Sequence, residues 1–157
     1  MVQKIKAIID TRENKDLVIV ARTDARAVNG LDDALDRAYA YAEAGADVTF
    51  VEAPRSIEEL QKITKELKGI PQMANMVEGG LTPLLSAQEL QDLDFKIMIC
   101  ANTALRAAIK GIRTALGILH DEGSQANLQD YICTWEERQT LFKLNKIKEL
   151  ENKYLKF

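Results

Sequence analysis

The chain has 157 residues, of which 46% are hydrophobic and 29% are charged, and its formal net charge is −3. This length allows one domain with a hydrophobic core but is too short for most complete eight-stranded barrels. The chain is mildly acidic, so its sequence predicts no basic surface for binding nucleic acid. No apolar run approaches the ~20 residues that span a bilayer. We therefore expect neither nucleic acid nor a membrane as a partner.

Signals for targeting and redox chemistry are sparse. The N-terminal residues lack the apolar stretch and small-residue cleavage site of a secretory signal. Cys100 and Cys133 are too few and too far apart for a disulfide or metal-ligand pattern. The simplest interpretation is a pair of reduced thiols in a cytoplasmic protein.

Short β-like runs, each followed by a helical pattern, recur along the chain. The continuous apolar run at 17–21 predicts a first strand that is covered on both faces. Apolar residues then recur at helical spacing over 31–42, and Gly45 stands where a glycine commonly ends a helix. The run at 48–52 predicts the second strand.

The second half of the pattern repeats this alternation. A capping-box pattern at 56–59 opens a helix that stops at Gly69 and is expected to bury four residues, Ile57, Leu60, Ile63 and Leu67. A third strand follows at 72–76, and another capping box at 86–89 opens a short helix. A fourth strand at 96–100 precedes a long helix that ends near Gly123. Such alternation predicts βαβ units and a parallel sheet.

Beyond Gly123 the alternation of strand-like and helical patterns ends. We expect one or two short helices over 128–142 and a surface helix with an apolar stripe over 143–157. The prediction is therefore four βα units in 1–123 and a helical extension in 124–157. This extension packs either on its own barrel or on a neighbouring subunit.

Four βα units make half of a closed barrel and leave two unpaired parallel edges, which soluble proteins seldom expose. Three arrangements remain open at this point. The missing half lies elsewhere, two such chains close one barrel, or the sheet is an open doubly wound one.

Polar residues follow three successive strands at the same place, where barrel enzymes carry their chemistry. Arg22 can grip a carboxylate through parallel hydrogen bonds, Glu52 can orient it, and Asn75 can donate to a second carboxylate. Each residue also has a simpler interpretation. Arg22 can be a surface residue paired with Asp24, Glu52 a loop residue before Pro54, and Asn75 a turn residue.

Other candidate residues carry weaker signals. The glycines at 79–80 lack the spacing of a phosphate-binding loop and are typical of a turn between strand and helix. His120, near the end of the long helix, is better placed to meet the helix dipole than to catalyse a reaction.

Several ordered motifs resemble the isocitrate lyase and phosphoenolpyruvate mutase superfamily, and methylisocitrate lyase and petal-death-type oxaloacetate hydrolase in particular. They are VARTDA at 20–25, AGAD at 44–47, FVEAP at 50–54, ANMVEGG at 74–80 with TPL at 82–84, and TALRAA at 103–108. The resemblance runs from about residue 2 to the end. It implies the C-terminal half of a (β/α)₈ TIM barrel, with a last helix that swaps between subunits of a homodimer or homotetramer.

The resemblance also implies chemistry. Family members bind Mg²⁺ and pass through an enolate-like oxyanion of a small carboxylic acid, and Arg22, Glu52 and Asn75 match residues that line the substrate site. The family's Mg²⁺ ligands and its cysteine-bearing loop belong to the half that precedes this sequence. Cys100 and Cys133 stand at other motif positions, so we expect no metal ligand and no catalytic cysteine here. The CAN sequence at 100–102 also departs from the Tyr-Pro commonly seen after the last strand.

The function expected from these residues is a Mg²⁺-dependent carbon–carbon lyase for a small 2-hydroxy or 2-oxo di- or tricarboxylate, of which this chain is a partial enzyme. The alternatives are an oxaloacetate hydrolase or decarboxylase, a carboxyphosphonoenolpyruvate phosphonomutase, and a catalytically silent half-barrel.

Overall fold

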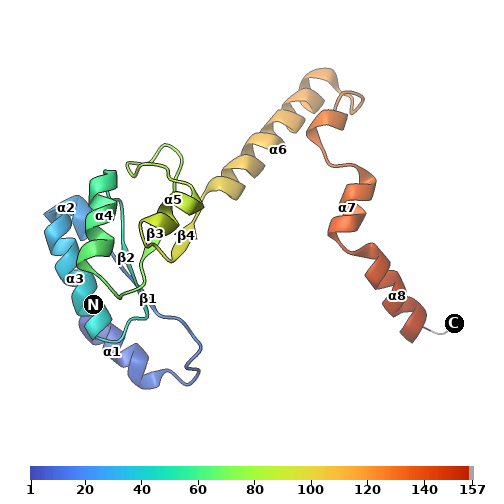
Figure 1. The fold of residues 1–157 in the computed structure, drawn as a ribbon. Coiled ribbons are helices and arrows are strands. Elements are labelled where there is room, and N and C mark those ends of the chain that lie inside the picture. The colour runs from blue at the N-terminus through green and yellow to red at the C-terminus, as the bar shows by residue number, and fades with distance from the viewer. Residues whose placement is uncertain (156–157) are drawn as a thin grey trace. The chain divides into compact units, whose positions relative to one another are not determined.

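The structure is a computed structural model that describes residues 1–155. The chain divides into two compact units, Met1–Ala104 and Leu105–Phe157 (Figure 1). The first unit contains α1 (Val2–Thr11), β1 (Val20–Thr23), α2 (Ala25–Asn29), α3 (Leu31–Glu43), β2 (Val48–Val51), α4 (Ile57–Glu66), β3 (Met73–Asn75), α5 (Ala87–Asp92) and β4 (Ile97–Ile99). The helices that follow are α6 (Thr103–Glu122), the 3₁₀ helix η1 (Gln129–Tyr131), α7 (Trp135–Leu141) and α8 (Leu144–Tyr154).

The strands are parallel and pair in sequence order. β1 pairs with β2 from Val20↔Val48 onward, and β3 pairs with β4 from Met73↔Ile97 onward. An isolated parallel bridge, Thr49↔Gln72, joins the two pairs of strands. Sequential parallel neighbours are typical of a barrel, whereas a doubly wound sheet reverses its order near the middle. The predicted succession of four βα units is confirmed.

The core lies between the strands and helices α3, α4 and α5. Leu60, Ile63 and Leu67 are almost fully buried there, as the pattern predicted. The same cluster contains Ala34, Leu35, Ala38, Val51, Ala74, Met76, Leu90 and Phe95. The prediction for Ile57 is wrong, since this first residue of α4 is 42% exposed.

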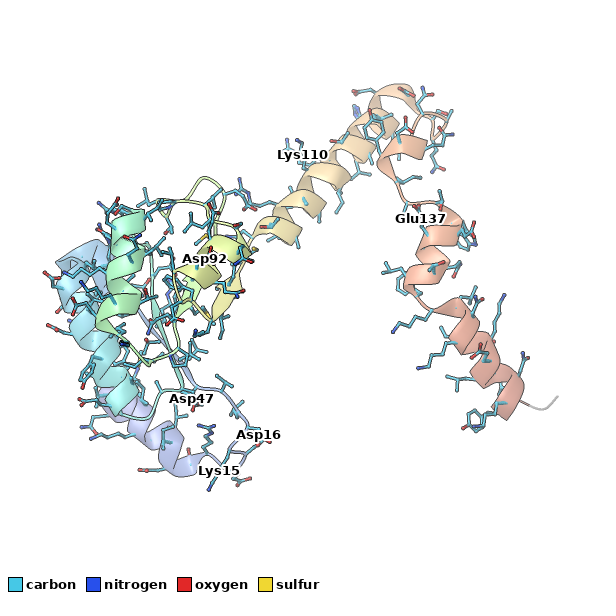
Figure 2. All side chains as sticks on the ribbon, in the orientation of Figure 1. Lys15, Asp16, Asp47, Asp92, Lys110 and Glu137 are labelled. Carbon is cyan, nitrogen blue, oxygen red and sulfur yellow. The ribbon has the colours of Figure 1, made fainter. Side chains whose placement is uncertain are left out.

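The first strand begins later than the apolar run predicted. Leu17 and Val18 are each 56% exposed, because the chain turns there and the Leu17 amide donates to the Asn14 carbonyl. Asp47 then anchors the segment, accepting hydrogen bonds from the Ile19 amide at 2.8 Å and from Arg12 Nη1 at 3.0 Å. Figure 2 shows Asp47 beside the loop that carries Lys15 and Asp16.

Helix α1 was not predicted, although its apolar residues recur at helical spacing. Ile5 is buried in a second cluster with Ala21, Tyr41 and Ala46, and Ile9 packs against this cluster. The helix comes so close to the end of α3 that a Cβ at Gly45 would lie 2.9 Å from Ile9 Cγ1. Gly45 also has a φ of +108°, so both the space and the backbone require glycine.

Gly45→Ala is therefore expected to destabilise the first unit by about 1–3 kcal/mol beyond the strain of positive φ, because the new methyl group overlaps Ile9. Gly69→Ala is the matched control, since Gly69 has a φ of +85° with no heavy atom within 4 Å of its Cβ position. Urea denaturation of both variants measures the difference. Equal losses in the free energy of unfolding for Gly45→Ala and Gly69→Ala would show that α1 does not pack on Gly45.

The two predicted capping boxes have different outcomes. At α5 the box is complete, since Ser86 accepts from the Glu89 amide and the Glu89 carboxylate accepts from the Ser86 amide. At α4 Ser56 accepts from the Glu59 amide, but the Glu59 carboxylate accepts from the Arg55 amide at 2.8 Å rather than from the Ser56 amide. The same carboxylate also meets the guanidinium of Arg26 at 2.9 and 2.5 Å, so a long-range ion pair accompanies a local contact that is shifted by one residue.

The second unit consists of helices with largely exposed apolar faces. Leu105, Ile109, Ile112 and Leu116 are between 48% and 61% exposed on α6. Leu128 is the one fully buried residue of this unit within the described range. The apolar stripe expected on the last helix occurs on α8 and includes Ile147, Leu150 and Tyr154, while residues 156–157 lie outside the described range. No helix within residues 1–155 is long and apolar enough to cross a membrane.

Candidate functional site

The three residues singled out in the sequence lie at the C-terminal ends of neighbouring strands. Arg22 lies in β1 and pairs with Phe50 of β2, and Asn75 is the last residue of β3. Glu52 directly follows β2, and its amide donates to the Thr23 carbonyl at 3.0 Å, which prolongs the ladder by one residue. All three residues therefore lie near one end of the sheet.

The alternation of side chains places these residues on one face. Ala21, Val51 and Ala74 belong to the clusters that pack against the helices. Because successive side chains of a strand point to opposite faces, the adjacent Arg22, Glu52 and Asn75 face away from the helices. In a barrel this face lines the interior.

Arg22 is the centre of the polar contacts on this face. Its Nε and Nη2 donate to the Asp24 carboxylate at 3.0 and 2.6 Å, and its Nη1 lies 3.3 Å from Glu52 Oε2. The guanidinium also lies over the Phe50 ring, 5.3 Å from the ring centroid. The Arg22 side chain is half exposed, so two carboxylates and a ring hold a cation that solvent still reaches.

The ion pair between Arg22 and Asp24 favours the charged form of both groups. The hydrogen bonds with Asp24 raise the pKa of Arg22, with a smaller contribution from the charge of Glu52. The same contact lowers the pKa of Asp24 below the usual carboxyl range. Arg22 is consequently a permanent cation, fixed in orientation before any ligand arrives.

Two acceptor oxygens on this face are buried without a hydrogen-bond donor among the described residues. They are Glu52 Oε2 and Asn75 Oδ1. The contact of Glu52 Oε2 with Arg22 is an ion pair at 3.3 Å that does not meet hydrogen-bond geometry. Buried acceptors are usually satisfied by protein or by ordered water, so these two oxygens are candidate acceptors for a water molecule or a ligand donor.

Comparisons with known proteins identify the family of this chain. Residues 1–119 match the phosphoenolpyruvate phosphomutase family. The chain belongs to the phosphoenolpyruvate mutase/isocitrate lyase superfamily. It is 44% identical to 2,3-dimethylmalate lyase of Eubacterium barkeri, covering 98% of this chain and 53% of the relative. It is 38% identical to the petal death protein of Dianthus caryophyllus, covering 98% of this chain and 48% of the relative.

Solved structures of superfamily members match as well. A crystal structure of 2,3-dimethylmalate lyase superposes with a TM-score of 0.88 at 30% identity, over 97% of this chain and 54% of that chain. Oxaloacetate acetylhydrolase in complex with the product oxalate gives 0.86 at 31% identity, over 96% and 52%. The chain thus spans about half the length of the superfamily members it matches, and the α/β barrel-type fold and the family resemblance are confirmed.

The three candidate residues do not by themselves form a metal site in the described part of the chain. One solved relative, phosphonopyruvate hydrolase, is a complex with oxalate and Mg²⁺. Within the described part of this chain, no three His, Cys, Asp or Glu side chains gather to hold a metal ion. Glu52 is the one carboxylate among the three site residues, and Arg22 already lies against it. A cation there would have to displace the guanidinium.

The loops that carry the site are tied together by contacts that the sequence did not reveal. Arg26, in the helix after β1, is paired with Glu59, in the helix after β2. Thr103, after β4, donates through Oγ1 to Glu78, after β3. Both pairs join residues far apart in the sequence, and no local pattern indicates which charge meets which.

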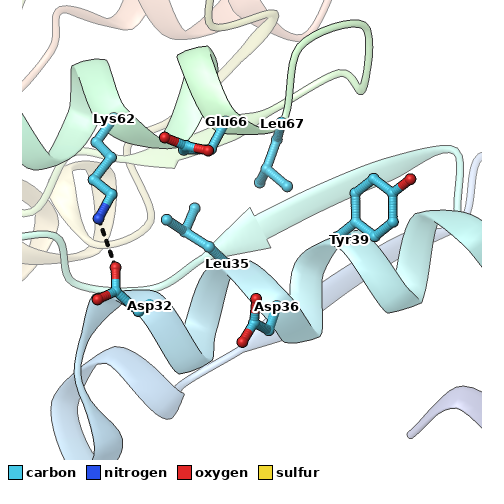
Figure 3. A pocket seen from close by; sticks show the side chains of 7 residues that line it. All are labelled: Asp32, Leu35, Asp36, Tyr39, Lys62, Glu66 and Leu67. Carbon is cyan, nitrogen blue, oxygen red and sulfur yellow. Dashed lines mark hydrogen bonds and ion pairs between the residues drawn. The ribbon is translucent and has the colours of Figure 1, made fainter.

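A surface groove lies apart from these residues. It has a volume of about 360 Å³ and lies between α3 and α4, where Lys62 Nζ meets Asp32 Oδ1 at 2.6 Å (Figure 3). Its walls include Asp36, Tyr39 and Glu66 but none of the three candidate site residues. His120 is exposed and pairs with the neighbouring Asp121, and Gly79 adopts a φ of +76°, as expected for a turn.

Proposed function

We propose that the full-length protein containing this half-barrel is a Mg²⁺-dependent carbon–carbon lyase. Its substrate is a small 2-hydroxy or 2-oxo di- or tricarboxylate of the methylisocitrate kind, and cleavage passes through an enolate. The supporting observation is Arg22, held against Asp24 and Glu52 on the face that Asn75 shares. The Mg²⁺ ligands are expected outside this chain.

Each site residue has a role that its chemistry allows. Cleavage of the carbon–carbon bond leaves negative charge on an oxygen beside a carboxylate, and a preplaced guanidinium stabilises such charge. Arg22 would bind the substrate carboxylate and this oxyanion. Glu52 would hold Arg22 and orient a substrate hydroxyl, and Asn75 would hold a second carboxylate through its amide.

Two other reactions use the same kind of site. The similarity to oxaloacetate acetylhydrolase favours a hydrolase or decarboxylase acting on oxaloacetate as the second candidate. A carboxyvinyl-carboxyphosphonate phosphorylmutase of Arabidopsis thaliana is 40% identical over 96% of this chain, so a phosphonomutase is the third. The Glu-Ala-Pro sequence at 52–54 suits the lyase and hydrolase branches better.

An assay of two proteins tests the proposal. The 157-residue chain and its full-length parent are each incubated with Mg²⁺ and methylisocitrate, dimethylmalate, isocitrate or oxaloacetate, and the products are identified. We expect the full-length protein to cleave a 2-hydroxy acid and the 157-residue chain to be silent. Oxalate and acetate from oxaloacetate alone would indicate the hydrolase instead. Cleavage by the short chain would contradict the division of the site between two halves.

The assembly and location belong to the same proposal. The exposed apolar residues of α6 and α8 would be covered by a neighbouring subunit in a homodimer or homotetramer with swapped helices. Cys100 and Cys133 are free and exposed, which suits a reducing cytoplasm. Light scattering of the full-length protein would distinguish dimer and tetramer from monomer.

A further inference from the structure

One bridge joins the two halves of the sheet, and the candidate site straddles it. β1 and β2 share a four-residue register, and β3 and β4 share a three-residue register. Between β2 and β3 the pairing reduces to Thr49↔Gln72, with the Thr49 amide donating to the Pro71 carbonyl at 3.0 Å. Arg22 and Glu52 lie on one side of this seam, which we define as the β2–β3 boundary, and Asn75 lies on the other.

The side chains of the bridge are fully buried and bonded to each other. Thr49 is 0% exposed and Gln72 is 1% exposed. Thr49 Oγ1 donates to Gln72 Oε1 at 2.9 Å, and Gln72 Nε2 donates to the Ile70 carbonyl at 2.9 Å. The Gln72 carbonyl accepts from the amides of Lys96 and Ile97, so this residue also ties β3 to β4.

Each residue of the bridge lies the same number of residues before a candidate site residue. Glu52 lies three residues after Thr49, and Asn75 lies three residues after Gln72. The bridge therefore sets Glu52 level with Asn75 on the opposite face of the sheet, roughly 10 Å further along the strands. Any sliding of β2 against β3 offsets the Glu52 carboxylate from the Asn75 amide along the strand direction by the same amount.

We infer that Thr49 and Gln72 are positioning residues, which fix the span between the Arg22–Glu52 pair and Asn75. An apolar pair of the same volume would fill the space but would let the strands slide, because dispersion contacts have no direction. The hydrogen bond resists sliding, since breaking it leaves a buried acceptor without a donor. The effect on turnover rests on the proposed function, whereas the effect on the seam itself does not.

The test uses three variants of the full-length protein and one control. Thr49→Ser keeps the hydroxyl. Thr49→Val removes it. Thr49→Val with Gln72→Met replaces both polar partners, so neither of them is left without the other, although the Ile70 carbonyl loses Gln72 Nε2 as its donor. Ile63→Val is the control, because Ile63 is 1% exposed in the core cluster and its apolar side chain takes no part in the hydrogen bond between Thr49 and Gln72. Each protein is compared by thermal unfolding, kcat, KM, oxalate binding and hydrogen exchange of the Thr49 amide.

We expect Thr49→Val and the double variant to lower kcat/KM and oxalate affinity by about tenfold or more, since small misplacements at a site are costly. Thr49→Ser should retain most of the activity and Ile63→Val all of it at matched stability. The backbone amide at position 49 should exchange faster in the double variant than in the control. A double variant with wild-type turnover, oxalate affinity and exchange would overturn the inference.

The outcomes separate the two proposals. If the wild-type protein cleaves none of the acids, the proposed lyase activity fails, and oxalate affinity and amide exchange still decide the role of the seam. If activity falls equally in Thr49→Val and Ile63→Val, the pair contributes stability alone and the positioning role is rejected.

Discussion

Arg22→Lys in the full-length protein is expected to lower kcat/KM by about a hundredfold or more, the loss typical for a removed oxyanion donor. Arg22 meets Asp24 through two hydrogen bonds and Glu52 through a third nitrogen. A lysine ammonium is a point charge that cannot keep this forked geometry and present a donor to the substrate as well. Steady-state kinetics with the substrate identified in the assay measure the loss.

Arg37→Lys is the matched control for this prediction. Arg37 is about as exposed as Arg22 and also binds one carboxylate, Asp33, but it lies on the outer surface of α3. Its replacement should leave kcat/KM within twofold of wild type, since exposed pairs of this kind contribute little. Undiminished turnover in Arg22→Lys would remove Arg22 from the mechanism.

Glu52→Gln is the second large effect that we expect, with a loss of about a hundredfold in kcat. The Glu52 side chain is 21% exposed, so its charge acts on Arg22 through a medium that screens it weakly. Asp24, at 64% exposed, holds the same guanidinium from the solvent side. Asp24→Asn should therefore cost much less, because water screens that charge and an amide oxygen can still accept one bond.

The contrast between the two carboxylate variants is the informative measurement. Thermal unfolding of each variant first establishes that the fold is intact. A larger loss for Asp24→Asn than for Glu52→Gln would indicate that the exposed partner orients Arg22 and that Glu52 is a structural neighbour. Equal small losses would place the chemistry elsewhere in the barrel.

The sequence alone was sufficient to predict the βα units, because each apolar run and helical pattern is a local signal. Arg22, Glu52 and Asn75 could be singled out as candidates for the same reason, since each comes directly at the end of such a run. The start of β1 was misplaced because Leu17 and Val18 have strand-like side chains in a segment that Asp47 holds as a turn. That contact is tertiary and leaves no local pattern.

Contacts between residues far apart in the sequence account for the other differences between the sequence predictions and the structure. Glu59 completes a capping-box pattern in the sequence, but in the structure its carboxylate accepts from the Arg55 amide and pairs with Arg26, and no periodicity in the sequence reveals the ion pair. Thr49 and Gln72 look like ordinary strand residues until the sheet places them opposite each other. Helix α1 could have been read from the spacing of Ile5 and Ile9, so its omission was an error of interpretation.

The residue that follows Glu52 has a consequence for engineering. Ala53 holds a φ of +57°, a conformation that costs a residue with a side chain about 1 kcal/mol, and Pro54 restricts its neighbour further. A screen for heat resistance would reward glycine at position 53, because that change relieves the strain. The same glycine would increase the conformational freedom of the Glu52 carboxylate. The more heat-resistant variants from such a screen should therefore be poorer catalysts.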